Sequence, residues 1–378
     1  MGHVRIAILH NRDHQLLEED PGREAREDVV RVAAALQAAL SGGRRDVALI
    51  PVDGDVLGIG RALESARADV VVNLCESLAA DSRGEMVVPA LLDLLALPYT
   101  GSSALSLGLS LHKNKAKELL RARNVPTPDF CVVDSVAEVA SIALPFPLIV
   151  KPSREDASVG IDFDSVVNDR ASLGKAVARV VRTFRQPALV ERFIDGREIY
   201  VPLLGNRPRN ALPLSEITFG AAFEGRPRVL GYTAKWDATS PLCIDSPSKT
   251  VTLSAALEKK CVDIALAAFA ALDCRDYGRV DLRVDSAGQP YVIDINPNCD
   301  LHPQAGYARA ASGAGIAYAD LALHLVELAL ERSHGNQANR SSRPAAARRA
   351  ALAHRNLLAG RGGMRARADR SRIDAGQP

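Results

Sequence analysis

The chain has 378 residues, of which 47% are hydrophobic and 24% charged, a composition typical of a globular protein with a large buried core. No apolar run approaches the roughly 20 residues of a membrane helix, and "MGHVRIAILHN" lacks the apolar region and cleavage site of a secretion signal. Six scattered cysteines without a CxxC pair disfavour a zinc site or a disulfide framework. We therefore expect a cytoplasmic protein with reduced thiols and no membrane partner.

The charge is unevenly distributed along the chain. Residues 333–378 contain ten arginines and two aspartates, a net charge of +8, so the other 332 residues carry −6 within the total of +2. This tail lacks sustained apolar periodicity and is predicted to be disordered. Clustered arginines attract phosphates, but no aromatic side chains interleave for base stacking, so nucleic acid is not the favoured partner.

Strands and helices alternate over residues 1–110, which predicts a parallel α/β domain with helices covering its sheet. The strands are "HVRIAIL", "DVALIPV" and "DVVVNLC", and the helices are "REDVVRVAAALQAAL" and "MVVPALLDLLA". We expect a central α+β domain over residues 111–204, a second α+β domain over 205–332 and the tail over 333–378.

The central domain is expected to begin with the helix "SLHKNKAKELLRARN", which Asn124 and the prolines of "VPTP" end. The strands "FPLIVKP", "PALVERF" and "EIYVPLL" and the helix "LGKAVARVVRTF" follow. The next domain contains further strands, an irregular stretch "KWDATSPLCIDSPSK", the helix "SAALEKKCVDIALAAFAAL", a hairpin and a last helix "GIAYADLALHLVELALER".

The hairpin "GRVDLRVDSAGQPYVIDINPN" carries the most specific chemistry. We expect a loop over Asp285–Pro290 with Val284 opposite Tyr291, a register that places Asp281 opposite Asp294 and Arg279 opposite Asn296. Like charges opposite each other destabilise a sheet, whereas two carboxylates and an amide oxygen suit Mg²⁺. The alternative is a solvated face on which Arg279 offsets the charge.

A carboxylate-bound Mg²⁺ usually takes substrate phosphates as its remaining ligands, so a phosphate loop is expected elsewhere in the chain. The candidate is "KPSREDASVG" (151–160), in which small residues let backbone N–H groups approach phosphates and Lys151 adds a positive charge. Lys113 and Lys235 are further candidates. Each lysine alone is typical of a surface, and together with the hairpin they form a pattern.

Residues 1–332 resemble the ATP-grasp superfamily, most closely the D-alanine–D-alanine ligase group. The similarity lies in segments that occur in the family's order: "MVVPALLDLLALPYTGS", "HKNKAKELLRARNVPTP", "LIVKPSREDASVG", "LVERFIDGREI", "YTAKW", the hairpin and the last helix. The resemblance implies an ATP-grasp fold of three domains, with ATP between the central lid domain and the C-terminal domain. It also allows a homodimer.

The resemblance implies a role for individual residues. Those at ATP-binding positions are Lys113, Lys151, Ser158, Glu191 (adenine segment), Glu198 (ribose) and Lys235. Those at the positions of metal ligands are Asp281, Asp294 and Asn296, with Asp294 where the ligases commonly have Glu. Arg279 matches an arginine that stabilises the transferring phosphoryl group, and Lys235 assists it. The implied cofactors are ATP and Mg²⁺ or Mn²⁺, with two ions.

The substrate-facing positions depart from the family. The family closes its site with a hydrogen-bonded Glu–Ser–Tyr set, which falls here on Glu27, Ala157 and Trp236. Asp300 stands where a substrate carboxylate is expected and favours a substrate with a cationic or hydroxylated group. We therefore expect an ADP-forming carboxylate–amine ligase that proceeds through an acyl phosphate and accepts small amino acid-like substrates. The alternatives are a true D-alanine–D-alanine ligase and a non-catalytic nucleotide-binding protein with a basic interaction tail.

Overall fold

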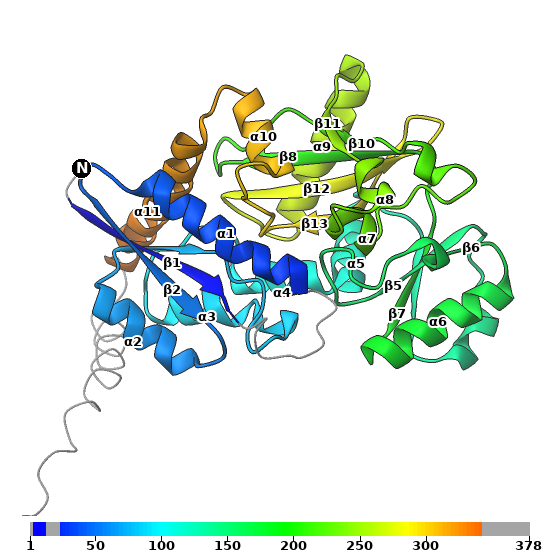
Figure 1. Cartoon of the computed structure of the whole chain (residues 1–378), viewed down its shortest axis with the longest axis horizontal. Helices are drawn as coiled ribbons and strands as arrows, with labels where there is room; N and C mark the ends of the chain where they lie inside the picture. The colour runs from blue at the N-terminus through cyan, green and yellow to red at the C-terminus, as the bar shows by residue number, and fades with distance from the viewer. Residues whose placement is uncertain (1–2, 13–22, 342–378) are drawn as a thin grey trace, which may run out of the picture. The chain divides into compact units, whose positions relative to one another are not determined.

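A computed structural model describes residues 3–12 and 23–341 (Figure 1). Of the tail predicted to be disordered, residues 342–378 lie outside the described part, whereas 333–341 continue the last helix. Three sheets follow one another along the chain, the first parallel and the other two antiparallel. This mixed α/β architecture confirms the predicted fold class.

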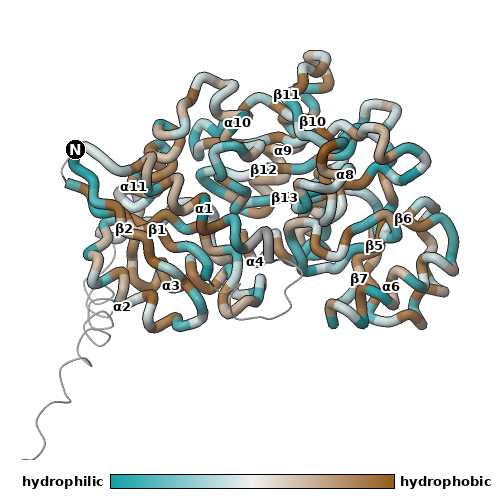
Figure 2. The backbone as a smooth tube through the Cα atoms, in the orientation of Figure 1, coloured by the Kyte–Doolittle hydropathy of each residue, from teal (hydrophilic) through white to brown (hydrophobic). Residues whose placement is uncertain are grey.

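The first sheet is parallel and has the order β2–β1–β3. Its strands are β1 (Val4–Asn11), β2 (Arg45–Val52) and β3 (Val70–Asn73). Ile6 and Ile8 of β1 face the core shared with α1 (Arg23–Leu40), and Ala7 and Leu9 face the core shared with α2 (Val56–Ala66) and α3 (Val87–Leu94). Because helices cover both faces, the middle of each strand is apolar on both faces, as Figure 2 shows for β1 and β2.

The helix predicted over 110–124 corresponds to α5 (Lys113–Ala122), and α4 (Ala104–Leu111), which was not predicted, precedes it. The break falls at His112, whose ψ of 79° is not helical. The Lys113 N–H donates to the Ser153 carbonyl at 3.0 Å, so the first turn of α5 is tied to the predicted phosphate loop. At the other end, Asn124 adopts a φ of 56°, which agrees with its predicted role in ending the helix.

The second sheet is antiparallel and has the order β4–β7–β5–β6. Its strands are β4 (Phe130–Val133), β7 (Ala188–Arg192), β5 (Leu148–Pro152) and β6 (Val166–Val167). Helix α6 (Arg170–Phe184) packs on it through Leu173 and Val177. Asp169 caps this helix by accepting from the Ser172 N–H at 2.8 Å, which satisfies one of the unpaired amides of the first turn.

The third sheet has the order β11–β10–β8–β12–β13, with β9 beside β8. Its strands are β8 (Arg197–Leu204), β9 (Asn210–Ala211), β10 (Ser215–Ile217), β11 (Ser248–Thr250), β12 (Tyr277–Val284) and β13 (Pro290–Asn296). Helix α9 (Ala255–Ala271) packs on one face. β8 therefore pairs with strands of the expected C-terminal domain, although it precedes the boundary expected after residue 204. The three domain boundaries themselves stay predictions.

The stretch expected to be irregular, 235–249, contains α8 (Pro241–Ile244), the end of α7 (Tyr232–Trp236) and the start of β11. The chain continues into α10 (Gly306–Gly313) and α11 (Tyr318–Ser341), and Tyr307 and Leu325 of these helices join the core that α1 lines. Within residues 3–12 and 23–341, no single helix has the length and hydropathy to cross a membrane. α10 and the segment 318–333 meet that criterion only as a pair bent by 101°.

The β12–β13 hairpin pairs Asp281 with Asp294 and Arg279 with Asn296, as predicted, but by a different path. Val284 lies opposite Pro290 rather than Tyr291, and the register shifts after Asp281, which leaves Ile293 as the extra residue of a β-bulge. The predicted tip register was wrong by one residue, and the bulge compensates for that error at the base of the hairpin.

Gly278 in β12 tests how tightly this hairpin packs on α9. A Cβ atom at Gly278 would lie 2.5 Å from the Phe269 ring and 2.9 Å from the Asn296 carbonyl oxygen. We expect Gly278→Ala to lower the free energy of unfolding by about 1–3 kcal/mol because the core cannot absorb the added methyl group. Urea denaturation measures this change in the free energy of unfolding. The control is Gly174→Ala in α6, where the space is open, which is expected to be neutral or stabilising; equal effects would contradict the packing argument.

Candidate active site

Two aspartates at the base of the hairpin are each held by a cation, the half-buried Arg279 and the buried Lys113. Arg279 donates to Asp281 through Nε at 2.6 Å and Nη2 at 2.8 Å, and the Asn296 Nδ2 donates to the same carboxylate at 3.1 Å. The Arg279 guanidinium also lies over the Tyr200 ring, 4.3 Å from its centroid. Burial disfavours the charge on Arg279, but Asp281 outweighs it and raises the pKa of the guanidinium.

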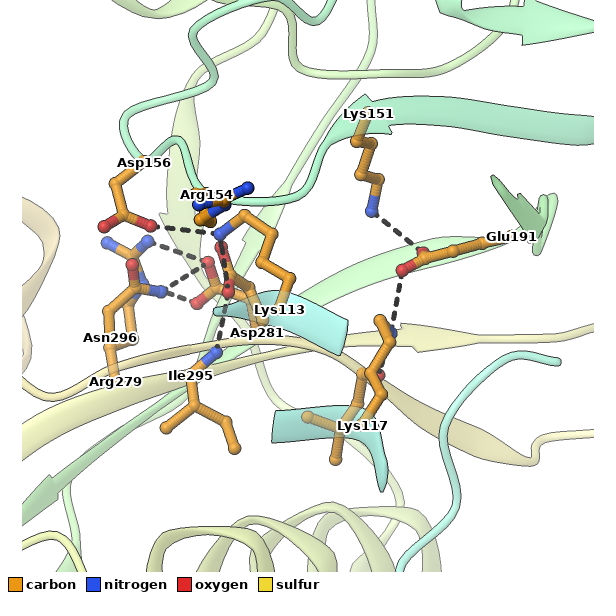
Figure 3. Close-up of polar contacts among 12 residues, drawn as sticks. Lys113, Lys117, Lys151, Arg154, Asp156, Glu191, Arg279, Asp281, Ile295 and Asn296 are labelled. Atoms are coloured by element: carbon orange, nitrogen blue, oxygen red, sulfur yellow. Dashed lines mark hydrogen bonds and ion pairs between the residues drawn. The ribbon is translucent and has the colours of Figure 1, made fainter. Parts of the chain in front are cut away.

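Lys113 is the cation of the second aspartate, at the start of α5 (Figure 3). Its Nζ lies 2.9 and 3.1 Å from the two Asp294 oxygens and 3.0 Å from Asp156 Oδ1 in the predicted phosphate loop. The side chain is only 6% exposed, and its burial opposes the charge. Asp294 and Asp156 outweigh that effect and raise the pKa of Lys113, while Lys113 lowers the pKa of Asp294 against the opposing effect of burial.

These contacts bear on whether the hairpin can hold a metal ion. Asp281, Asp294 and Asn296 supply oxygen ligands of the kind that Mg²⁺ prefers, and they meet on one face of the sheet. Within the described residues, no group of three or more His, Cys, Asp or Glu has the arrangement of a metal site. The set therefore fits an ion that takes its other ligands from phosphates or water, and such an ion would have to share the Asp294 oxygens with Lys113.

A second buried cluster lies beside the first. Glu191 on β7 is 1% exposed, with one oxygen 3.0 Å from the Lys151 Nζ and the other 2.9 Å from the Lys117 Nζ. Lys117 also donates to Thr127 Oγ1 at 2.8 Å. Burial raises the pKa of Glu191, but the two ammonium groups outweigh it and lower this pKa. Lys117 was missed in the sequence, although its spacing of four residues from Lys113 places both on one helix face.

Glu198, at the position implied for the ribose, is also engaged by a cation. It is buried on β8, where its Oε2 lies 3.2 Å from Arg283 Nη2 and its Oε1 accepts from the Tyr200 hydroxyl at 2.9 Å. Arg283 stacks near Phe193, with its guanidinium 5.2 Å from the ring centroid. Arg283 was not singled out in the sequence, although it alternates with Arg279 and Asp281 along one strand face.

The segment 151–160 leaves β5 and folds into a tight loop. Ala157 and Ser158 have φ values of 54° and 63°, and Gly160 has 77°. The Ala157 carbonyl accepts a hydrogen bond from the Trp236 Nε1–H at 2.9 Å. The structure thus brings together two of the three residues placed at the family's closing set, through a backbone carbonyl rather than a hydroxyl.

A cavity of about 450 Å³ opens beside the hairpin. Predicted residues that line it are Lys235, Trp236, Arg279, Asn296 and Asp300. Carboxylates that the sequence reasoning missed also line it: Asp28, Glu76, Glu85, Glu155 and Asp156. Burial raises the pKa of Asp300, with Asp28 adding to the effect, and burial likewise raises the pKa of Glu85.

Glu27, the remaining predicted residue, is not brought to this cavity. It is exposed on α1, whereas its neighbour Asp28 lines the cavity and accepts from the Arg31 Nε at 2.8 Å. One residue turns a side chain by about 100° around a helix of 3.6 residues per turn, which is why Asp28 lines the cavity and Glu27 does not. The assignment of Glu27 to the substrate site stays a prediction.

The model for the family described as D-ala D-ala ligase C-terminus matches residues 119–327, more than half of the chain. The chain belongs to the D-alanine–D-alanine ligase family. It is 31% identical over 254 residues to the D-alanine–D-alanine ligase of Pelotomaculum thermopropionicum (65% of this chain, 76% of that protein). It is 40% identical over 267 residues to an uncharacterised protein, y4sG, of Sinorhizobium fredii (71% of this chain, 76% of that protein).

A solved D-alanine–D-alanine ligase from Bacillus anthracis, in complex with ATP, shares the fold of this ligase-family chain. It superimposes with a TM-score of 0.69 at 22% identity and covers 88% of this chain and 99% of its own. The family uses ATP and Mg²⁺. The chain is thus a member of an ATP-dependent ligase family.

Glu191→Gln tests the buried Lys117–Glu191–Lys151 cluster. The substitution would leave two buried ammonium groups without a carboxylate, and we expect a loss of about 3–5 kcal/mol in the free energy of unfolding, measured by urea denaturation. The control is Asp263→Asn, which breaks the exposed Lys259–Asp263 pair of α9 and should cost less than about 1 kcal/mol. A loss no larger than that of the control would show that the cluster contributes little to stability.

Proposed function

We propose that the chain is an ADP-forming carboxylate–amine ligase that uses ATP and two Mg²⁺ or Mn²⁺ ions and accepts amino acid-like substrates other than two D-alanines. One observation carries the proposal: Arg279, Lys235 and Asn296 open onto the same cavity as Asp156, whose carboxylate holds Lys113 beside Asp294. Cations and oxygen ligands therefore meet at one end of a cavity large enough for small substrates.

The proposed reaction has two steps. A substrate carboxylate oxygen attacks the γ-phosphorus of ATP, the bond from that phosphorus to the bridging oxygen breaks, and ADP leaves. The uncharged amine then attacks the acyl carbon of the acyl phosphate, a C–N bond forms, and inorganic phosphate leaves as the amine gives up a proton. A bound Mg²⁺ supplies neutralisation of the phosphate charge, as in other phosphoryl transfers.

The residues of this chain contribute mainly charge and position. Arg279 and Lys235 face the cavity and would stabilise negative charge on the transferring phosphoryl group. Lys113 and Lys151 would bind ATP phosphates, with the loop around Ser158 covering them. Glu191 and Glu198 would lie along the adenine and ribose, where Glu198 would share its carboxylate with Arg283.

The cavity supports a substrate other than D-alanine. Ala157 supplies no hydroxyl and Trp236 cannot accept a hydrogen bond, so the polar groups that a D-alanine ligase uses to close its site are changed. Asp28 and Asp300 both line the cavity, where burial and, to a smaller extent, the charge of Asp28 raise the pKa of Asp300. Such a pair favours a substrate that carries an additional ammonium or hydroxyl group.

The other candidates are a true D-alanine–D-alanine ligase, which these substitutions disfavour, and a nucleotide-binding protein that relies on its basic tail. The second candidate would not need Asp281, Asp294 and Asn296 on one face. A homodimer is the assembly that fits the family, and size-exclusion chromatography with light scattering would establish it.

The proposed reaction predicts ADP release from Mg²⁺-ATP that requires both a carboxylate and an amine, with a product whose mass equals their sum less one water. With hydroxylamine as the trapping amine, the correct carboxylate should yield a hydroxamate. Arg279→Gln is expected to slow ADP release by about 10²–10³-fold. The matched control, Arg61→Gln, alters an arginine of α2 whose side chain is 73% exposed and should leave the rate unchanged. Substrate-independent ADP release, or none with any carboxylate, would contradict the proposal.

Asp300→Asn should separate substrate binding from stability. Because folding raises the pKa of Asp300 above its ordinary 3.8, the ionised carboxylate destabilises the fold at neutral pH, and this cost disappears as the pH falls below 3.8. We expect the variant to melt at a higher temperature at pH 7, with no advantage at pH 3.5, and to bind cationic substrates at least 10-fold more weakly. Unchanged kinetics on every accepted substrate would exclude Asp300 from the substrate site.

A further inference from the structure

Helix α7 runs alongside the loop 157–161 and contacts it at both ends. At its start, the Tyr232 N–H donates to the Ile161 carbonyl at 3.0 Å, and a Cβ atom on Gly231 would lie only 2.7 Å from that oxygen. At its end, the Trp236 indole N–H donates to the Ala157 carbonyl at 2.9 Å. A five-residue helix thus spans the loop from its first left-handed residue to its last turn.

The conformation of the loop makes this contact depend on its backbone. Ala157 and Ser158 both adopt left-handed conformations, which residues with a Cβ atom rarely do outside turns. Two hydrogen bonds close the turn itself, from the Val159 N–H to the Asp156 carbonyl (3.0 Å) and from the Ile161 N–H to the Ser158 carbonyl (3.1 Å). The Ala157 carbonyl is left facing outward, and the indole donor meets it there.

The same helix carries Lys235 into the cavity. Lys235 precedes Trp236, its Nζ lies 5.4 Å from the indole ring centroid, and both side chains line the cavity. On its other side the loop is tied to α5 through the pair between Asp156 and Lys113. The loop therefore lies between two cationic lysines, and the indole bond joins it to the one on α7.

We propose that Trp236 is a positioning residue that clasps the phosphate loop through its indole N–H and thereby couples the closed loop to the placement of Lys235. An indole offers one donor and no acceptor, so it cannot join a chain of hydroxyls, but a backbone carbonyl is a sufficient partner for it. The clasp uses the backbone carbonyl of residue 157, so it does not require a hydroxyl side chain there and an alanine is sufficient. The contact between Trp236 and the loop does not depend on which reaction the protein catalyses, whereas its effect on turnover rests on the proposed function.

The first test is hydrogen exchange of the full chain followed by mass spectrometry. Trp236→Phe keeps a planar ring and removes the N–H, so amides within 157–161 should exchange about 3- to 10-fold faster, as expected for loss of one hydrogen bond. Thr233→Ala, at an exposed position of the same helix, is the control and should change nothing. Unchanged exchange at Val159 and Ile161 in the Trp236→Phe protein would overturn the clasp.

The second test observes the indole itself in a protein that keeps it. Trp236 is the only tryptophan in the chain, so intrinsic tryptophan fluorescence reports on this one side chain. Ala157→Pro fixes φ near −65° and cannot hold the observed 54°, which turns the carbonyl away from the indole. The emission maximum should move to longer wavelength and quenching by acrylamide should increase. Emission identical to that of the unaltered protein would refute the contact, even if Trp236→Phe proved too unstable to study.

The catalytic consequence has a separate readout. Once an accepted substrate pair is known, Trp236→Phe should raise the ratio of ADP released to product joined at least 3-fold, because an opened loop admits water to the acyl phosphate. Faster exchange together with an unchanged ratio would overturn the coupling to catalysis while the clasp stands. Absence of any substrate-dependent ADP release in the unaltered protein would instead overturn the proposed function, and the exchange and fluorescence results would still decide the clasp.

Discussion

The ion pairs of Lys113 connect parts of the chain that are far apart in sequence. Lys113 is the first residue of α5. One of its partners, Asp294, lies near the end of β13, and the other, Asp156, belongs to the loop after β5. A buried charge without a partner is so unfavourable that the folded state needs these three segments side by side. The same constraint acts on Arg279 with Asp281 and on Glu191 with Lys117 and Lys151. The geometry around the cavity is therefore fixed by the pairing of charges as much as by the apolar cores behind it.

The parts of the fold that follow from periodicity could be predicted from the sequence. The strands of the first sheet were expected where they occur because they are short apolar runs, and α6 and the hairpin because their apolar residues recur with the period of a helix or a strand. The short elements α7, α8 and β11 were not, since their residues lack such a pattern; β11 depends on its pairing with β10, and α7 on its hydrogen bonds to the loop 157–161. The break at His112 likewise depends on a contact with Ser153, which lies about 40 residues away in the chain.

The candidate site was found where chemistry and spacing agreed, and missed where a partner had to be identified. Strand alternation predicts that four residues share one face of the hairpin: Arg279, Asp281, Asp294 and Asn296. Lys117 was missed because nothing in the sequence says that Glu191, some 70 residues later, needs a second cation. Motifs indicated the ligase family, whereas the acidic lining of the cavity emerged only when α1 and the segment after β3 came together.

The bulge at Ile293 separates the hairpin into a tip and a base that obey different alternation. On the tip side of the bulge, Val292 faces the core that α9 lines. On the base side, Ile295 faces the same core, which leaves Asp294 on the opposite face together with Asp281. Changes in the length of the turn can shift the pairing of the tip without moving the carboxylates, provided that the bulge absorbs the shift. The outer turn of the hairpin can therefore change in length while the arrangement of charges at its base stays the same.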